Sequence, residues 1–210
     1  MAIKPILFNT EMVWAILDGR KDATRRIVKG FIPDDAVWGY TAFTPKWYIS
    51  CRGTFADGYG EKFFKLPCEP GDILYVRETW KKAQNGYYYY EDWQRNDIAD
   101  VTKWKPSIHM PKEAARIWLK VTDVRVERLQ DITPKGAESE GVGNLFYDDI
   151  GYGEKNYGTE VDTEYGIAKE QFAWLWESTI KKSDLDRYGW DANPWVWVIE
   201  FEQCEKPEGV

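Results

Sequence analysis

The sequence predicts an α+β fold in which a small mixed or antiparallel β-barrel carries two or three peripheral helices. Roughly five or six short segments have the alternating, β-branched and aromatic character of strands. They do not alternate regularly with helices, as the strands of a doubly wound sheet do. The longest strand signal also slips by one residue, as a β-bulge does where a sheet bends. With 210 residues, the chain is expected to form a single domain over residues 1–210.

The N-terminal part predicts a strand, a helix and a second strand in succession. Residues 5–8 form a short apolar run that is expected to be a strand. A helix should begin after Asn9, whose side chain can cap it, and should end at Gly19. Glycine readily adopts the left-handed conformation that follows a helix. The next segment, residues 24–26, is expected to be extended.

The rest of the chain predicts three strands and two helices. A helix should begin at Thr133, an N-cap residue followed by proline, and should end at Gly141. The alternation of apolar residues from Ile117 to Val121 resumes one residue out of phase at Val124, which gives the slip. The other predicted elements are a strand over 73–80, a long strand over 117–126, a helix over 168–179 and a closing strand over 195–202.

Three stretches fit none of these elements and are interpreted as insertions, at about 30–66, 81–110 and 143–167. The first is rich in aromatic residues and is expected to contain a hairpin. The second holds the run Tyr87–Tyr90. The third is rich in glycine, tyrosine and acidic residues, a composition typical of a surface loop.

The charge of the chain limits its partners. Its 28 basic and 35 acidic residues give a formal net charge of −7 and a pI near 5.0. This argues against sequence-blind binding to duplex DNA, which depends on neutralising phosphates. A nucleoside, single-stranded nucleic acid or one localised contact stays compatible with the charge. The 16 % of aromatic residues would allow base stacking.

The sequence predicts neither a metal nor a cofactor. Cys51, Cys68 and Cys204 are odd in number and lack CxxC spacing, so no zinc site or disulfide framework is expected. His109 is the single histidine, and no glycine-rich nucleotide-binding motif occurs. With no signal-peptide pattern and no apolar run of membrane-spanning length, we expect a cytoplasmic protein with no membrane partner.

Residues 19–26 form a basic segment in an acidic chain, and they are the candidate contact for an anion or a nucleic acid. Cations beyond a helix end can merely complement its dipole, at about 0.3–1 kcal/mol each, which is sufficient for Arg20 or Lys21 alone. Nearby arginines should also lower the pKa of Lys21, so that it could accept a proton from Thr24 or from water. A carboxylate would complete this set of catalytic groups, and the sequence pattern does not indicate which acidic residue supplies it.

The pattern Gly19-Arg20-Lys21-x-x-Thr24-x-Arg26 after a short helix resembles the signature of ASCH domains, members of the PUA-like β-barrel superfamily. Three further segments match in the family's order: 70–74, 129–133 with Ala137 and Glu140, and 197–201. Segments 77–80, 106–111 and 190–195 are similar to ASCH proteins of phages and prophages. The resemblance spans nearly the whole chain, and it implies a PUA-like barrel in the cytoplasm of a bacterial host.

The resemblance also implies a function. PUA-like domains bind RNA or modified bases in a cleft beside the barrel. One ASCH branch is similar to amidohydrolases that remove the acetyl group from N4-acetylcytidine. By this resemblance Lys21, Thr24 and Glu140 would be catalytic: Lys21 would activate Thr24 or a water, and Glu140 would pass a proton to the leaving amine. The expected ligand- or nucleic-acid-binding residues are Arg20, Arg25, Arg26, Arg77 and His109.

Two other functions remain open from the sequence. One alternative is a non-catalytic protein that recognises RNA or a modified base through its basic stretch and its aromatic insertions. The other is a phage accessory protein whose aromatic insertions form a protein interface. Lys21, Thr24 and Glu140 would then form a structural polar cluster at the mouth of the barrel.

Overall fold

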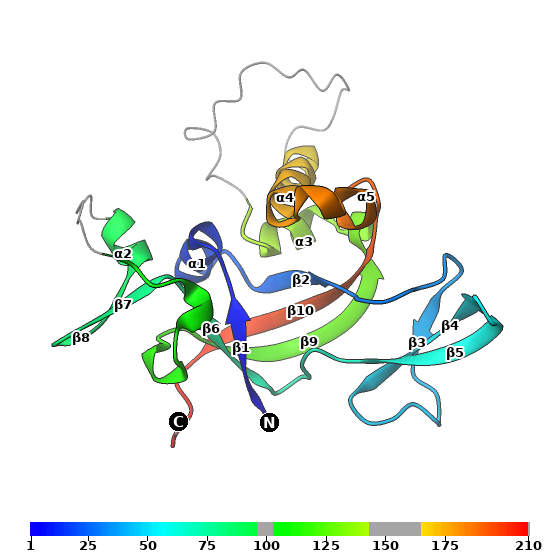
Figure 1. Cartoon of the computed structure of the whole chain (residues 1–210), viewed down its shortest axis with the longest axis horizontal. Helices are drawn as coiled ribbons and strands as arrows, with labels where there is room; N and C mark the ends of the chain where they lie inside the picture. The colour runs from blue at the N-terminus through cyan, green and yellow to red at the C-terminus, as the bar shows by residue number, and fades with distance from the viewer. Residues whose placement is uncertain (96–102, 143–164, 210) are drawn as a thin grey trace, which may run out of the picture.

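The computed structural model describes residues 1–95, 103–142 and 165–209 of the chain (Figure 1). The described residues form an α+β arrangement with several sheets and few helices, as predicted. Most of the predicted insertion at 143–167 lies outside the described residues. No helix in the described part of the chain is both long and apolar enough to cross a membrane.

Five strands form the central sheet. They are β1 (Ile3–Leu7), β6 (Ile73–Arg77), β9 (Trp118–Arg128), β10 (Trp195–Cys204) and β2 (Ala23–Ile27), in that spatial order. β1 runs parallel to β6, and the other neighbours are antiparallel, so the sheet is mixed as predicted. Among the described strands no ladder joins the edge strands β1 and β2. The expected barrel is therefore not closed by hydrogen bonds between these two strands.

The helix between β1 and β2 begins and ends where the sequence predicts. In α1 (Thr10–Leu17), the Asn9 side chain accepts a hydrogen bond from the Met12 backbone N–H at 2.9 Å. Gly19 follows the helix with a φ of +72°, a left-handed conformation that glycine adopts at little cost. The chain then turns directly into β2, which fixes where the basic residues lie.

The predicted slip in the long strand is a β-bulge. Glu200 of β10 lies opposite Asp123 of β9, whereas the next residue, Phe201, lies opposite Val121. Thr122 is thus the extra residue on β9. Because the bulge absorbs one residue, Val121 and Val124 both remain buried on the core side of the sheet.

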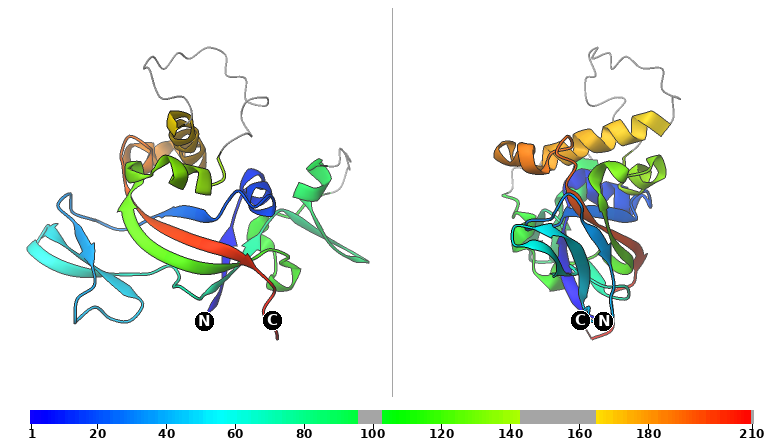
Figure 2. Two further views of the ribbon diagram at one scale, coloured as in Figure 1. Left: turned by 180° about the vertical axis from the view of Figure 1, so that it is seen from behind. Right: turned by 90° about the vertical axis from the view of Figure 1, so that its right-hand side faces the viewer.

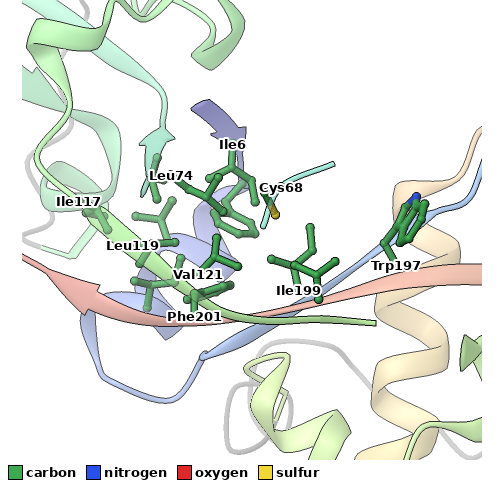
Figure 3. Close-up of a cluster of buried hydrophobic side chains, with 14 of the residues drawn as sticks. Ile6, Cys68, Leu74, Ile117, Leu119, Val121, Trp197, Ile199 and Phe201 are labelled. Atoms are coloured by element: carbon green, nitrogen blue, oxygen red, sulfur yellow. The ribbon is translucent and has the colours of Figure 1, made fainter. Parts of the chain in front are cut away.

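The central sheet is buried on one face and covered in part on the other. On one face, α1 and the core side of the sheet enclose the cluster that includes Ile6, Leu74, Val121, Ile199 and Phe201 (Figure 3). On the opposite face, α3 (Pro134–Ser139) and α4 (Tyr165–Thr179) cover the part of the sheet that carries Val196 and Val198 (Figures 1 and 2). Thr133 caps α3 by accepting from the Gly136 N–H at 3.0 Å, as predicted. The chain returns to β10 through a short helix, α5 (Leu185–Tyr188).

Two further sheets stand at opposite ends of the central sheet (Figure 2). One consists of β3 (Val37–Gly39), β4 (Tyr48–Phe55) and β5 (Gly58–Lys65), and its β4–β5 pair is the hairpin expected at 30–66. Tyr40, Phe43 and Tyr59 of this region are exposed. The other sheet is the hairpin of β7 (Trp80–Ala83) and β8 (Gly86–Tyr89), followed by α2 (Tyr90–Arg95). Short 3₁₀ turns lie at Ser107–His109, Lys112–Ala114, Leu129–Asp131 and Lys182–Asp184.

The strand predicted over 73–80 is divided in two. β6 ends at Arg77, and Trp80 already belongs to β7. The break lies at Glu78, whose N–H donates to the Met110 sulfur at 3.2 Å and whose carboxylate is bound by Arg116. These contacts replace the ladder bonds that a continuous strand would form.

Candidate functional site

The candidate site forms where the chain leaves α1 and meets the end of α3. An antiparallel backbone bridge pairs Lys21 with Glu140, and the Asp22 N–H donates to the Ser139 carbonyl at 3.0 Å. The Lys21 N–H donates to the Ala15 carbonyl, also at 3.0 Å. Backbone contacts therefore bring together two residues that lie 119 positions apart in the sequence.

Lys21 and Glu140 form a buried ion pair. The Lys21 Nζ donates to the Glu140 carboxylate at 2.7 Å, and to the carbonyl oxygens of Glu140 and Ala23, each at 2.8 Å. The three acceptors match the three N–H groups of the ammonium. Burial lowers the pKa of Lys21, and the carboxylate of Glu140 opposes this by favouring the charged form.

Arg25 extends this pair into a network of four charges. Its NH1 donates to the Glu140 carboxylate at 3.2 Å, and its Nε and NH2 donate to Glu127 at 3.1 and 2.6 Å. Two carboxylates thus balance two cations, and each residue holds its neighbours in position. Glu127 was not predicted, because its proximity to Arg25 depends on the order of β9, β10 and β2 in the sheet.

Thr24 lies on the other side of β2. It pairs with Ile199 across the ladder, whereas Arg25 pairs with Val198, so the two side chains point to opposite faces. The Thr24 hydroxyl is fully buried and accepts from Arg26 NH1 at 2.6 Å. The structure therefore brings Lys21 to Glu140 and Thr24 to Arg26, and no hydrogen bond joins Lys21 to Thr24 among the described residues.

A cavity of about 310 Å³ opens beside the four-charge network, between β2 and α4. Glu140, Arg25 and Arg26 reach its wall, and neither Lys21 nor Thr24 does. The remaining wall comes from Leu7, Asn9, Met12, Ile27, Phe172, Leu175, Trp176, Thr179 and Ile180. We call this space the β2–α4 cavity. Its wall combines charged groups with apolar and aromatic side chains.

The aromatic side of the cavity could be anticipated only in part. Phe172 and Trp176 follow the helical spacing of α4, which predicts burial but not a ligand wall. The Arg25 guanidinium lies 5.6 Å from the centre of the Phe172 ring, within cation–π range. This contact links the charged network to the aromatic wall.

Three predicted ligand-binding residues lie away from the β2–α4 cavity. Arg20 donates to the Gly141 carbonyl at 3.0 Å and to Asp18 at 3.2 Å, so it fastens the ends of α1 and α3 together. His109 is exposed in the Ser107–His109 turn and does not line the cavity. Arg77 lines a different cavity, on β1 and β6.

The described part of the chain contains no group of three or more His, Cys, Asp or Glu side chains placed to hold a metal ion. Cys51, Cys68 and Cys204 are free thiols. Burial raises the pKa of Cys51 to about 11 and that of Cys68 to about 12, so both thiols stay protonated at neutral pH.

A second charged cluster, in which Glu78 and Glu91 are buried, was not anticipated from the sequence. Arg116 binds both carboxylate oxygens of Glu78, at 2.9 and 2.7 Å, and NH1 of Arg116 also binds Asp92. Glu91 is buried beside them, and burial together with the charge of Glu78 raises its pKa to about 8. The cluster fastens the β7–β8 region to the start of β9.

No protein-family model, curated protein or solved structure matches the chain.

Proposed function

We propose that the chain is an ASCH-type, PUA-like domain that binds a modified nucleobase or nucleoside, free or within RNA, in the β2–α4 cavity. One observation carries this proposal: the cavity combines an aromatic wall, formed by Phe172 and Trp176, with fixed polar groups on Glu140 and Arg25. Recognition of an unstacked base requires both a flat apolar surface and polar groups at its edge. A volume of about 310 Å³ is at the lower end of ligand pockets, which suits one nucleoside.

The polar groups complement the edge of a pyrimidine. The Glu140 carboxylate can accept from an exocyclic or ring N–H, and the Arg25 guanidinium can donate to a ring carbonyl. Lys21 and Glu127 hold these two side chains in place before a ligand arrives. Such preorganisation lowers the entropy cost of binding.

Pairing of Arg25 favours recognition of a base over recognition of a phosphate backbone at the polar edge of this cavity. Of the two arginines that line it, Arg25 is neutralised by Glu127 and Glu140, and Arg26 donates to the Thr24 hydroxyl and to two backbone carbonyls. Cations that are already paired release few counterions when a polyanion binds. We therefore infer that any RNA is held here through one base.

The PUA-like barrel is part of the same proposal. The mixed order of the central sheet and its bulge fit a barrel that remains open between β1 and β2. Across this opening, Arg26 NH2 donates to the Leu7 carbonyl at 3.1 Å. A side chain would thus bridge the two edge strands where backbone hydrogen bonds do not.

Hydrolysis of an N4-acylcytidine-type amide is the second candidate function, and the 2.7 Å contact between Lys21 and Glu140 favours it. Water would attack the amide carbonyl carbon and give its proton to Glu140, with Lys21 stabilising the carboxylate. Glu140 would return the proton to the departing amine as the C–N bond breaks, giving cytidine and acetic acid, which releases its proton to solvent and becomes acetate. Lys21 and Thr24 do not line the cavity, so they would act indirectly, Lys21 through Glu140 and Thr24 through Arg26.

Calorimetric titration with cytidine and N4-acetylcytidine tests the binding proposal. Thr179 lines the cavity on the exposed side of α4, so Thr179→Trp should fill the space and abolish binding. Glu177→Gln changes an exposed residue on the same helix and should bind like the wild type. Equal binding by Thr179→Trp and wild type would reject the β2–α4 cavity as the site.

Release of acetate from N4-acetylcytidine tests the second candidate separately. Turnover by the wild type that is lost in Lys21→Met, with an unchanged circular dichroism spectrum, would support hydrolysis. Binding without turnover by the wild type would reject hydrolysis and leave the binding proposal standing.

A further inference from the structure

A second cavity of about 310 Å³ lies at the opening between β1 and β2. It shares Leu7 and Arg26 with the β2–α4 cavity. Its apolar floor includes Ile6, Cys68, Leu74 and Ile199, which Figure 3 shows grouped together. We call this space the β1–β6 cavity. Its charged wall consists of Lys4, Arg26 and Arg77, and none of the residues that line it is acidic.

Among the residues that the structure describes, the hydrogen-bond partners of Arg26 are all neutral. Its NH1 donates to the Thr24 hydroxyl at 2.6 Å and to the Arg25 carbonyl at 2.9 Å, and its NH2 donates to the Leu7 carbonyl. In the described ranges no carboxylate lies within ion-pair distance of its guanidinium. Arg26 is half-buried, so its charge is only partly screened by water.

Arg77 also lines the cavity and likewise donates to neutral groups. Its NH1 donates to the Ile108 carbonyl and its NH2 to the Tyr75 hydroxyl, both at 3.2 Å. Its Nε is buried and has no acceptor in the part of the chain that the structure describes. A buried donor without a partner costs free energy, so the Arg77 guanidinium is incompletely satisfied.

No acidic residue lines the cavity to offset this positive charge, and Glu140 acts on Arg26 from the β2–α4 side. Lys4 has an acidic partner, Asp72 at 2.9 Å, and Asp72 itself does not line the cavity. Cys68 faces the cavity as a neutral thiol, because burial raises its pKa to about 12. Two arginines without acidic partners thus share one cavity in a chain whose net charge is −7.

We propose that the β1–β6 cavity binds a phosphate group, with Arg26 and Arg77 as its charged ligands. The planar fork of a guanidinium matches the oxygen atoms of phosphate and donates to two of them at once. The group could belong to a mononucleotide or to the backbone of a single strand. This site does not depend on the β2–α4 cavity binding a nucleoside.

Thermal unfolding and calorimetry at constant ionic strength test the proposal with inorganic phosphate, cytidine monophosphate and a short oligouridylate. Phosphate should raise the melting temperature of the wild type. Arg77→Gln should weaken phosphate binding by about tenfold or more, since a charged donor is lost. Arg187→Gln removes the same charge from an exposed position on α5 and should bind phosphate like the wild type.

The controls separate the two sites and the two sources of phosphate. Arg77→Lys keeps the charge and should recover part of the affinity, which shows that Arg77→Gln is not merely misfolded. Stabilisation by phosphate should persist in Thr179→Trp, in which the β2–α4 cavity is filled. Tighter binding of the mononucleotide or of the oligonucleotide identifies the source. No stabilisation by any of the three compounds, or an equal response in Arg77→Gln, would overturn the proposal.

Discussion

At the scale of single residues, Glu140 is the carboxylate on which the buried ion pairs depend. It accepts from both Lys21 and Arg25, and all three side chains are buried. Glu140→Gln should therefore destabilise the protein by about 3–5 kcal/mol, because Lys21 would be left without a counter-charge. Urea unfolding measures this loss. Glu138→Gln, at an exposed position of α3, should change the free energy of unfolding by less than about 0.5 kcal/mol. Similar values for the two variants would contradict the network.

Glu91 gives the protein a pH dependence at the residue scale. Burial and the charge of Glu78 raise the pKa of Glu91 from 4.5 to about 8, so the folded state holds this proton more tightly than the unfolded state. The free energy of unfolding should then fall as the pH rises from about 4.5 to about 8. The slope due to this one proton is at most about 1.4 kcal/mol per pH unit.

Glu91→Gln should flatten this pH dependence, because an amide does not ionise. Urea unfolding of both proteins across the pH range measures the difference between them. Glu170→Gln, at an exposed position on α4, is the matched control and should leave the slope as it is. Identical slopes for the wild type and Glu91→Gln would show that Glu91 does not carry the effect.

At the scale of elements, the end of α3 must approach α1 closely for Lys21 to meet Glu140. Gly141 has a φ of +87°, and a Cβ added there would lie 2.6 Å from the Ala15 Cβ and 3.1 Å from the Lys21 Cβ. Gly141→Ala should therefore add a steric clash to the cost of the left-handed conformation. Gly19 has a similar φ of +72° with no atom within 4 Å of an added Cβ.

Gly19→Ala is thus a matched control that isolates the conformational cost, about 1 kcal/mol. Gly141→Ala should lower the free energy of unfolding by about 1–3 kcal/mol more than Gly19→Ala does. Chemical denaturation of the two variants measures the difference. Equal losses would show that α1 and α3 can separate without cost.

The elements that the sequence predicted correctly are those with local physical causes. Asn9 and Gly19 bound α1, Thr133 and Gly141 bound α3, and the phase slip gave the bulge at Thr122. The division of the strand at 73–80 was missed, because Glu78 leaves the ladder to meet Arg116, a partner 38 residues away.

Only those residues of the candidate site that belong to a recognisable sequence motif could be predicted. The contact between Lys21 and Glu140 was expected from the family resemblance, and their proximity is seen. Glu127 and the aromatic wall depend on which strands and helices lie side by side, and local patterns do not encode this. The alternation of β2 also sends Thr24 and Arg25 to opposite faces, which separates Thr24 from the ion pairs.

At the scale of the whole molecule, net charge and ion pairing determine how binding responds to salt. The chain carries a net charge of −7, and the cations nearest the β2–α4 cavity are mostly paired. Binding of cytidine there should change by less than about twofold between roughly 50 and 200 mM salt, since few counterions are released. Calorimetry at several salt concentrations checks this. A steep loss of affinity would indicate that phosphate-like contacts dominate.

A crystal structure of the chain with N4-acetylcytidine or its product is the most direct test of the proposed nucleoside site. The pyrimidine ring should lie in the β2–α4 cavity, against Phe172 and Trp176, with its polar edge toward Glu140 and Arg25. A ligand bound on the exposed aromatic residues of the β3–β5 sheet, with the β2–α4 cavity empty, would contradict the proposal.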